Sequence, residues 1–380
     1  MKTLHIITAL NVGGAETALY NILHGGLSKK FDTCVVSLCD IGVIGLKIRS
    51  LGVPVITLNM NSGIFSIFNL TRLIKIVRVF QPDIVQGWMY HGNFAAIFSS
   101  VLAFKKTKLV WNIRHSLSDI AYEKRMTRVM IKLNRMLSFR VDKILYNSFA
   151  SKAQHENFGF FSKKGTVIPN GINLDKFYFS NDICKRVRSD LVIPNDAKVI
   201  GHVARLHPMK DHQLFFSVAI RLALKYPKIH FIVCGRGVPS SSLVKTIPDE
   251  VSDRFHILDE SYEIPSLMNA MNIFCLSSAW GEGFPNVLGE AMSVGIPCVS
   301  TNVGDSKLVI GDTGKTVQPC DEDAFFVNIE TLLEKSLKDF YNLGVNARKR
   351  IEDNYSLNKI VQLYAKLYNE VAKESKVKKL

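Results

Sequence analysis

Short apolar runs alternate with helical patterns along the whole chain, and this alternation restricts the fold more than any other feature. In the first half, the strand-like runs lie at residues 4–9, 33–38, 53–57, 84–86, 109–113, 143–146 and 167–169. The second half repeats the pattern at residues 199–203, 230–234, 255–257, 273–276, 297–300 and 316–317. Helical apolar spacing falls between most of these runs. Because alternating strands and helices build parallel sheets covered on both faces, we predict an α/β chain with doubly wound sheets.

The length of 380 residues exceeds what one hydrophobic core usually supports, so two domains are expected. Turn residues replace periodicity at 170–180, which places the linker near residue 177 and predicts domains at 1–177 and 178–355. Apolar side chains then share one face of a helical pattern at 357–371. That apolar face could pack against either domain. We expect the terminal segment 356–380 to pack against the N-terminal domain.

Positive charge is concentrated in the first half. Residues 1–175 contain 22 Lys and Arg against 9 Asp and Glu, whereas residues 176–380 contain 26 against 24. Basic and apolar residues alternate with helical spacing at 121–140, a pattern typical of an amphipathic helix that lies on an anionic membrane surface. A solvated helix on a basic protein gives the same pattern. Nucleic acid is not an expected partner, because aromatic residues are not interleaved with the basic ones as a stacking platform requires.

The sequence also bears on the compartment. Residues 1–10 read as a strand, without the basic start and long apolar core of a signal peptide. The best candidate for a membrane span, residues 94–104, has about half of the roughly 20 residues that a crossing helix needs. Seven cysteines without a Cys-x-x-Cys pair indicate buried thiols in a reducing compartment. We therefore expect a cytoplasmic protein, peripheral on the inner face of the cell membrane.

The segment 281–297 predicts a helix whose amino end is opened by glycine. Pro285 suits the first helical position, Gly295 suits the position just past the end, and Pro297 prevents continuation, so the helix is expected at about 285–294. The amino end of such a helix carries unpaired N–H groups, and Gly283 allows a phosphate to approach the backbone. This pattern predicts an anion site.

Charged residues lie at this helix start and in the loop that follows the strand at 199–203. Glu282 lies just before the helix and Glu290 one turn beyond Asn286, and carboxylates beside a diphosphate are best employed on sugar hydroxyls. Both could instead complement only the helix dipole or solvent. Arg205 and Lys210 follow the strand at 199–203 and are placed to neutralise one diphosphate without a metal, although such loop charges are often only surface charges.

These motifs together resemble the retaining glycosyltransferases of family 4. The similarity runs in order through Gly13-Gly14-Ala15-Glu16, the segment 167–172 with Phe177, Arg205 with Lys210, Cys234-Gly-Arg-Gly237, and the segment from Glu282 to Glu290. It covers nearly the whole chain, and the pair of glutamates around Gly-Phe-Pro-Asn is its most specific part. The resemblance implies the GT-B fold, in which two Rossmann-like domains with doubly wound parallel sheets face a cleft.

The resemblance also implies roles for individual residues. Glu290 would hold the ribose of a nucleotide-sugar donor, Glu282 the donor sugar, and Arg205 and Lys210 the diphosphate. Further donor-binding positions are Gly13, Gly14, Gly235, Gly237, Tyr262, Ile264, Gly283, Phe284, Pro285 and Asn286, with Tyr262 to Ile264 near the base. His115 would face the reacting sugar, so the expected catalytic set is His115, Glu282, Arg205 and Lys210. His91 is the candidate on the acceptor side.

Two departures from the family pattern concern the donor side. Leu308 stands where the family often has an acidic residue, and Asn272 stands where it often has aspartate before the strand at 273–276. The Asp-x-Asp at 321–323 precedes a helical run and is better explained as a helix start than as a metal site. We expect no cofactor and no catalytic metal.

The expected reaction is transfer of a sugar, with retention at the anomeric carbon, from a UDP- or GDP-linked donor. The acceptor would be a saccharide or a lipid-diphosphate-linked saccharide in O-antigen, lipopolysaccharide, capsule or exopolysaccharide synthesis. A dehydrogenase is not favoured, because no Gly-x-Gly-x-x-Gly follows the first strand. The alternative that stays open is a non-catalytic sugar-nucleotide-binding or scaffold protein of the same fold.

Overall fold

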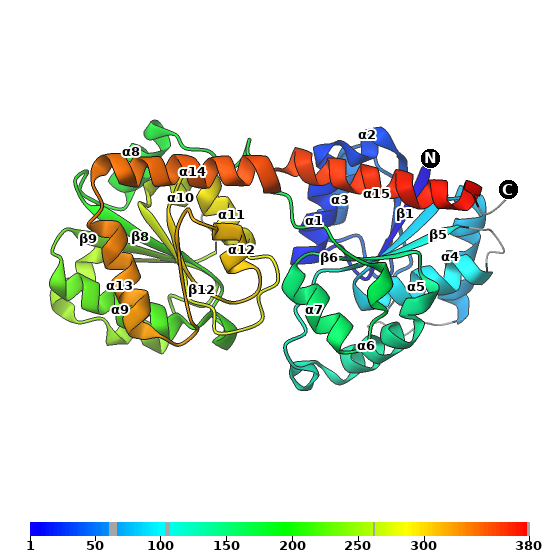
Figure 1. Ribbon diagram of the computed structural model, residues 1–380, viewed down its shortest axis with the longest axis horizontal. Coiled ribbons are helices and arrows are strands. Elements are labelled where there is room, and N and C mark those ends of the chain that lie inside the picture. The colour runs from blue at the N-terminus through cyan, green and yellow to red at the C-terminus, as the bar shows by residue number, and fades with distance from the viewer. Residues whose placement is uncertain (61–66, 103–106, 261–262, 378–380) are drawn as a thin grey trace. The chain divides into compact units, whose positions relative to one another are not determined.

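The computed structural model describes residues 1–60, 67–102, 107–260 and 263–377, and it divides into two compact units (Figure 1). The first comprises Met1–Gly171 with Leu357–Leu380, and the second comprises Ile172–Ser356. The division falls before Ile172 and not near residue 177, because the Ile172 N–H donates to the Tyr355 carbonyl at 2.8 Å and Ile172 forms a β-bridge with Ser356. The turn residues that suggested a linker therefore lie inside the second unit.

The first unit is built on a parallel sheet in the order β3-β2-β1-β4-β5-β6-β7 among the described residues. Its strands are β1 (Lys2–Ile7), β2 (Asp32–Ser37), β3 (Val55–Thr57), β4 (Ile84–Trp88), β5 (Lys108–Ile113), β6 (Lys143–Tyr146) and β7 (Gly165–Val167). Each predicted strand of this half is present, and the first and the last each begin two residues earlier than predicted. The apolar runs are continuous because both faces of the sheet are buried.

Helices cover both faces of this sheet. They are α1 (Gly14–Ile22), α2 (Ser28–Lys30), α3 (Gly42–Ser50), α4 (Ile67–Phe80), α5 (Met89–Leu102), α6 (Arg125–Leu137), α7 (Phe149–Asn157) and α15 (Leu357–Val377). Short π and 3-10 turns lie at η1 (Leu23–Leu27), η2 (Ile120–Tyr122), η3 (Ser138–Arg140) and η4 (Ser162–Lys164). One face packs against α4, α5 and α6, and the other against α1, α3 and α15. The terminal helix α15 contributes Ile360, Tyr364 and Tyr368 to the core on the face with α1 and α3. It therefore packs on the first unit, as predicted.

The second unit repeats the plan with a parallel sheet in the order β10-β9-β8-β11-β12-β13. Its strands are β8 (Lys198–Val203), β9 (Ile229–Cys234), β10 (Phe255–Leu258), β11 (Ile273–Leu276), β12 (Cys298–Thr301) and β13 (Lys315–Val317). Its helices are α8 (Asn181–Asp190), α9 (His212–Lys225), α10 (Ile264–Ala270), α11 (Asn286–Ser293), α12 (Ser306–Ile310), α13 (Glu322–Leu333) and α14 (Leu337–Tyr355), with turns η5 (Pro208–Lys210), η6 (Ser242–Thr246) and η7 (Asp249–Arg254). In both sheets the strands run parallel, so their carboxyl ends lie at one edge, where such folds bind ligands.

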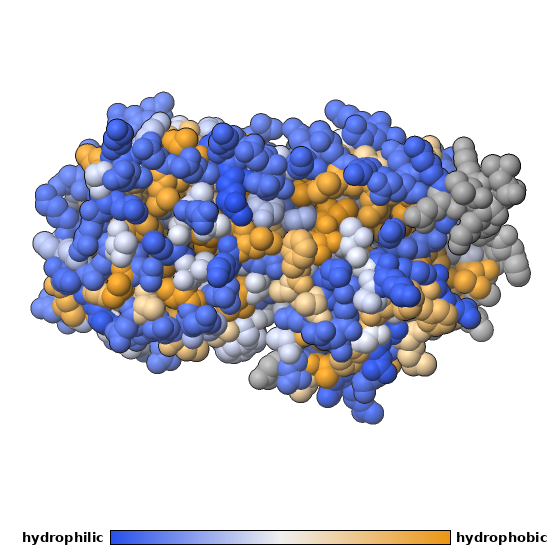
Figure 2. Space-filling view, viewed as in Figure 1, coloured by the Kyte–Doolittle hydropathy of each residue, from blue (hydrophilic) through white to orange (hydrophobic). Residues whose placement is uncertain are grey.

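The basic segment predicted at 121–140 forms η2, α6 and η3. Met130 and Ile131 of α6 are buried in the core, whereas Met126, Val129 and Met136 are exposed among its basic residues. On the face drawn in Figure 2, hydrophilic residues dominate and hydrophobic ones gather in separate patches. No helix in the described part of the chain is both long enough and apolar enough to cross a bilayer.

The cysteines are mostly internal, as the apolar runs around them indicated. Cys34, Cys234, Cys275 and Cys298 are buried, and burial raises the pKa of the Cys234 thiol to about 11. Cys39 and Cys184 are half-buried, and Cys320 lies exposed between β13 and α13.

Candidate active site

Two loops of the second unit form one platform at the carboxyl ends of the neighbouring strands β8 and β11. The Ala279 N–H donates to the Met209 carbonyl at 2.9 Å. The Ser277 hydroxyl donates to the Lys210 carbonyl at 2.8 Å. These bonds hold the loop after β8 against the loop after β11, so the side chains of the two loops are positioned together.

Lys210 and Glu282 meet on this platform. The Lys210 ammonium donates to Glu282 Oε1, and the same oxygen accepts from the Ser278 hydroxyl at 2.6 Å. The two charged side chains are only 17% and 9% exposed, so water screens the pair weakly. The structure thus brings together two of the predicted site residues and adds Ser278, which the sequence analysis did not identify.

Arg205 lies two residues after the end of β8 and is exposed, so its guanidinium is accessible to an anion. Two glycines shape its surroundings. A Cβ at Gly235 would lie 1.9 Å from the Ala204 carbonyl oxygen, which shows how closely the loops after β8 and β9 approach. Gly237 has a φ of +83°, a conformation that favours glycine. These predicted positions therefore shape the backbone beside Arg205.

The predicted glycine-opened helix is α11, and its start differs in one respect. Pro285 is the residue that caps the helix, with a φ of −78° and a ψ of 90°, so it precedes the first turn instead of beginning it. Gly295 has a φ of +86° and ends the helix as expected. The ring of Phe284 is buried and lies 5.3 Å from the ring of Tyr355, so its side chain packs in the core of the second unit. Asn286 begins the helix and is exposed.

Glu290 lies one turn beyond Asn286 on α11 and is half-buried. Desolvation raises the pKa of its carboxyl from 4.5 to about 7, and Lys176 partly opposes this shift. The carboxyl is therefore poised between its neutral and ionised forms near neutral pH. A strongly perturbed carboxyl beside a helix start is a feature of functional sites.

The structure also places the other residues that the sequence predicted to bind the donor, except Tyr262. Ile264 begins α10 and is half-buried. Tyr262 lies outside the described residues. Gly13 caps α1 and Gly14 is its first residue, and a Cβ at Gly13 would lie 2.4 Å from the Glu16 carboxylate. Both glycines belong to the first unit, together with His91 and His115.

His115 follows β5 and has two partners inside the first unit. Its Nε2 lies 3.3 Å from Glu123 Oε1, and its Nδ1 lies 3.2 Å from the Tyr90 hydroxyl. Burial lowers the pKa of His115, and Glu123 opposes this effect. His91 lies near the start of α5, where burial also lowers its pKa. The sequence did not indicate Tyr90 and Glu123, because only the fold brings their side chains to His115.

No group of three or more potential metal ligands occurs among the residues that the structure describes. The Asp-x-Asp at 321–323 forms the predicted helix start, since the Asp321 carboxylate accepts from the Ala324 N–H at 3.0 Å and caps α13. Glu322 and Asp323 pair with Arg221.

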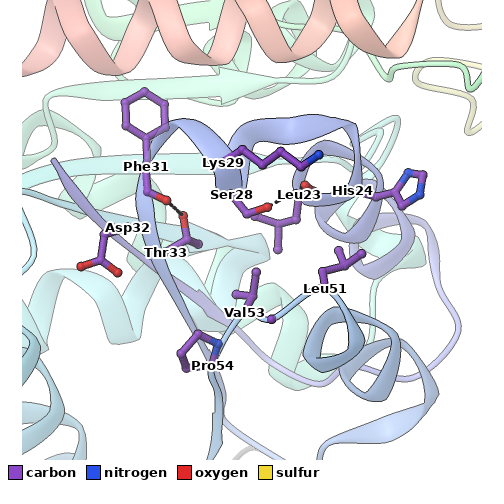
Figure 3. Close-up of a pocket in the computed structure, with 11 residues that line it drawn as sticks. Leu23, His24, Ser28, Lys29, Phe31, Asp32, Thr33, Leu51, Val53 and Pro54 are labelled. Atoms are coloured by element: carbon purple, nitrogen blue, oxygen red, sulfur yellow. Dashed lines mark hydrogen bonds between the residues drawn. The ribbon is translucent and has the colours of Figure 1, made fainter.

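A separate cavity of about 240 Å³ lies in the first unit, where Asp32 begins β2 and Pro54 precedes β3 (Figure 3). This is the amino edge of the sheet, opposite the edge at which such folds bind ligands. Its hydroxyl groups are paired locally, because Ser28 donates to the Leu23 carbonyl and Thr33 to the Phe31 carbonyl, each at 2.9 Å. This cavity therefore differs from the platform of the second unit, which lies at the carboxyl ends of the strands and carries the Lys210–Glu282 pair.

Comparison with known proteins agrees with these features. Residues 12–176 match the model of Glycosyltransferase Family 4, and residues 197–335 match that of the Glycosyl transferases group 1. The chain is 30% identical over 247 residues to the capsular polysaccharide biosynthesis glycosyltransferase CapM of Staphylococcus aureus, covering 62% of this chain and 60% of CapM. It is 26% identical over 215 residues to the UDP-Gal:alpha-D-GlcNAc-diphosphoundecaprenol alpha-1,3-galactosyltransferase of Escherichia coli, covering 54% of each. The similarity thus spans little more than half the length of these two relatives.

The solved structures agree over the whole fold. The crystal structure of Anabaena HepE in complex with UDP superimposes with a TM-score of 0.83, at 20% identity, and covers 97% of this chain and all of HepE. The two units are therefore the two Rossmann-like domains of the GT-B architecture.

Proposed function

Because the chain belongs to glycosyltransferase family 4, we propose that it transfers a sugar from a nucleotide-diphosphate donor to a saccharide or lipid-linked saccharide in surface-polysaccharide synthesis. The observation that carries this proposal is the Lys210, Glu282 and Ser278 cluster beside the start of α11. A cation, a carboxylate that can accept from sugar hydroxyls and the amino end of a helix are what a nucleotide-sugar donor requires.

The donor is proposed to be a UDP-sugar, with a GDP-sugar as the alternative. Two relatives support this choice: HepE, which has the same fold, was crystallised with UDP and with UDP-glucose, and the Escherichia coli relative is a UDP-Gal transferase. In this assignment the half-buried Glu290 binds the ribose hydroxyls. Its neutral form can donate a hydrogen bond and its ionised form can only accept one.

Lys210 and Arg205 would stabilise the departing diphosphate. An ammonium has three N–H donors, so Lys210 can keep its bond to Glu282 while its other N–H groups reach phosphate oxygens. Negative charge grows on the diphosphate as the bond to the sugar breaks, and preorganised cations stabilise that charge most in a poorly hydrated site. Glu282 would hold the sugar hydroxyls. We propose that the transfer retains the anomeric configuration and requires neither metal nor cofactor.

The acceptor side is proposed to work at an anionic membrane surface through α6. Arg125, Arg128, Lys132 and Arg135 lie exposed on this helix beside the exposed Met126, Val129 and Met136. Each basic residue near an anionic leaflet is worth about 1 kcal/mol, and apolar side chains add insertion into the headgroup region. Flotation with anionic liposomes checks this. The double variant Arg128→Glu and Lys132→Glu should stay in solution, whereas Lys185→Glu on the exposed face of α8 should float like the unmodified chain.

The function itself is tested with purified full-length protein, a panel of UDP- and GDP-sugars, and a polyisoprenyl-diphosphate-linked saccharide. Mass spectrometry detects sugar transfer, and NMR of the product reports its anomeric configuration. Transfer from one donor that disappears on Lys210→Met supports the proposal. Donor binding without transfer to any acceptor favours the non-catalytic sugar-nucleotide-binding or scaffold protein. Absence of binding to every nucleotide sugar overturns both functions.

A further inference from the structure

Four side chains of the first unit form one hydrogen-bonded row that ends on a backbone carbonyl. His155 Nδ1 lies 2.8 Å from the carbonyl of Ser151, both on α7. His155 Nε2 lies 2.7 Å from the Tyr90 hydroxyl on α5. That hydroxyl lies 3.2 Å from His115 Nδ1, and His115 Nε2 lies 3.3 Å from Glu123. We call these four residues the His115 row.

The carbonyl at its end fixes the direction of every proton in the row. A carbonyl can only accept, so His155 Nδ1 carries a proton. Burial lowers the pKa of His155 to about 4, so its ring is neutral near pH 7 and its Nε2 accepts. The Tyr90 hydroxyl, whose pKa is raised well above its usual value by burial, therefore donates to His155.

The direction of the Tyr90 hydrogen bond determines the tautomer of His115. Since the Tyr90 proton is directed to His155, the Tyr90 oxygen can only accept from His115, and His115 Nδ1 must carry a proton. The remaining nitrogen, Nε2, is then the atom of His115 that gains and loses a proton. It faces the carboxylate of Glu123, which accepts when Nε2 is protonated and repels its lone pair when it is not.

The backbone of His115 is fixed by the same helix. The Ser151 hydroxyl donates to the His115 carbonyl at 2.6 Å, and Ser148 caps α7 by accepting from the Ser151 N–H at 2.9 Å. α7 thus holds both the main chain of His115 and, through His155 and Tyr90, its ring. Such control of ring orientation and tautomer by outer partners is a known property of functional histidines.

We infer that Tyr90 and His155 are positioning residues that hold His115 in the Nδ1-protonated tautomer. Nε2 is thereby presented as the single exchangeable position, shared between Glu123 and an incoming sugar hydroxyl. The role of the hydroxyl rests on the proposed function. The tautomer does not, because it follows from contacts inside the first unit.

The experiment is NMR of the full chain with ¹⁵N-labelled histidine, recorded first without any ligand. Unmodified protein should show His115 protonated at Nδ1, with Nε2 titrating. Tyr90→Phe removes the acceptor, so His115 should exchange between tautomers or settle with Nε2 protonated towards Glu123. The matched control is Tyr146→Phe: the Tyr146 ring lies 5.6 Å from that of His155, but its hydroxyl has no hydrogen-bond partner among the described residues. This control should leave the His115 signals unchanged.

Two results overturn the inference: a neutral His115 protonated only at Nε2 in the unmodified protein, or the same His115 tautomer in Tyr90→Phe. Thermal unfolding of both variants shows whether they fold, and His155→Gln repeats the test if Tyr90→Phe does not. Addition of UDP-glucose and other nucleotide sugars then tests the donor separately. If His115 is the Nδ1-protonated tautomer but its signals do not change with any nucleotide sugar, the tautomer inference stands and the result counts against the proposed function.

Discussion

The ammonium of Lys210 donates a hydrogen bond to the carboxylate of Glu282, although 72 positions separate them in the sequence. They meet because β8 and β11 are neighbours in the second sheet and each residue belongs to the loop that follows its strand. Each charge compensates the other. Because an ammonium has three N–H donors, a bound diphosphate would share Lys210 with the Glu282 carboxylate, and this shared lysine would couple recognition of the diphosphate to recognition of the sugar.

Replacement of Lys210 should cost both stability and donor affinity. Lys210→Met leaves the Glu282 carboxylate largely buried without its cation, which we expect to lower the free energy of unfolding by about 3 kcal/mol at pH 7. Denaturant titration measures this loss, and calorimetry with the donor measures the affinity.

The matched control for Lys210→Met is Lys225→Met, because the Lys225 ammonium that pairs with Glu330 is exposed to solvent and its loss should lower the free energy of unfolding much less. Adding Glu282→Gln to Lys210→Met should restore most of the lost stability, because no buried charge is then left unpaired. Equal stability of Lys210→Met and Lys225→Met would contradict the importance of this ion pair.

Glu282→Gln alone should affect turnover more than donor binding. The amide oxygen can still accept from the Ser278 hydroxyl, but the negative charge that would hold sugar hydroxyls is gone. We expect kcat to fall by about 100-fold, the usual scale for loss of one preorganised group in a transition state. Steady-state kinetics, with donor affinity measured by calorimetry, separate the two effects. A rise in KM with unchanged kcat would show that Glu282 only binds the donor.

Glu290 should make stability depend on pH. Burial raises the pKa of its carboxyl from 4.5 to about 7, so between these values the folded chain holds a proton that the unfolded chain has released. The free energy of unfolding should therefore fall as pH rises from about 4.5 to about 7 and level off above it. Glu290→Gln should remove a change on the order of 2–3 kcal/mol.

Denaturant titrations of Glu290→Gln across this window provide the check. Glu330→Gln is a suitable control, because hydrogen bonds from Lys225 and Tyr226 lower the pKa of Glu330 and its contribution has the opposite sign. If the free energy of unfolding of Glu290→Gln varies with pH between 4.5 and 7 as that of the unmodified chain does, the Glu290 carboxyl is not the cause of that pH dependence.

The fold was predictable from the sequence because its strands are buried on both faces, which leaves continuous apolar runs such as 273–276. α11 was also placed within one residue at each end, since Gly295 in its left-handed conformation marks a helix end locally. The pairing of Lys210 with Glu282 was not predictable, because it depends on which strands are neighbours. Tyr90, Glu123 and His155 were missed for the same reason, since tertiary packing alone brings them to His115.

Gly304 should prove essential to the shape of the loop that carries Glu282 and Gly283. Its φ is +61°, and an added Cβ would lie 2.5 Å from the Glu282 carbonyl oxygen and 2.6 Å from that of Gly283. Gly304→Ala must therefore displace the loop that carries Glu282, and we expect at least a tenfold loss of donor affinity, equivalent to about 1.4 kcal/mol. Gly52→Ala is the matched control, because Gly52 has a φ of +80° with no atom within 4 Å of the added Cβ. Both variants carry backbone strain, so equal donor affinity in the two would refute the steric argument.

Glu123 should set the pH at which His115 changes its charge. The ionisable groups facing His115 are Glu123, Tyr90 of α5 and His155 of α7. Burial lowers the pKa of His115 and the Glu123 carboxylate opposes it, so Glu123→Gln should lower that pKa further. The neutral form of His115 then persists to lower pH, and the acid limb of kcat/KM should move to lower pH in the same direction. Asp119→Asn, which keeps a capping side chain at the start of η2, should leave the profile in place. A shift of the acid limb to higher pH in Glu123→Gln would mean that the carboxylate does not stabilise the protonated ring.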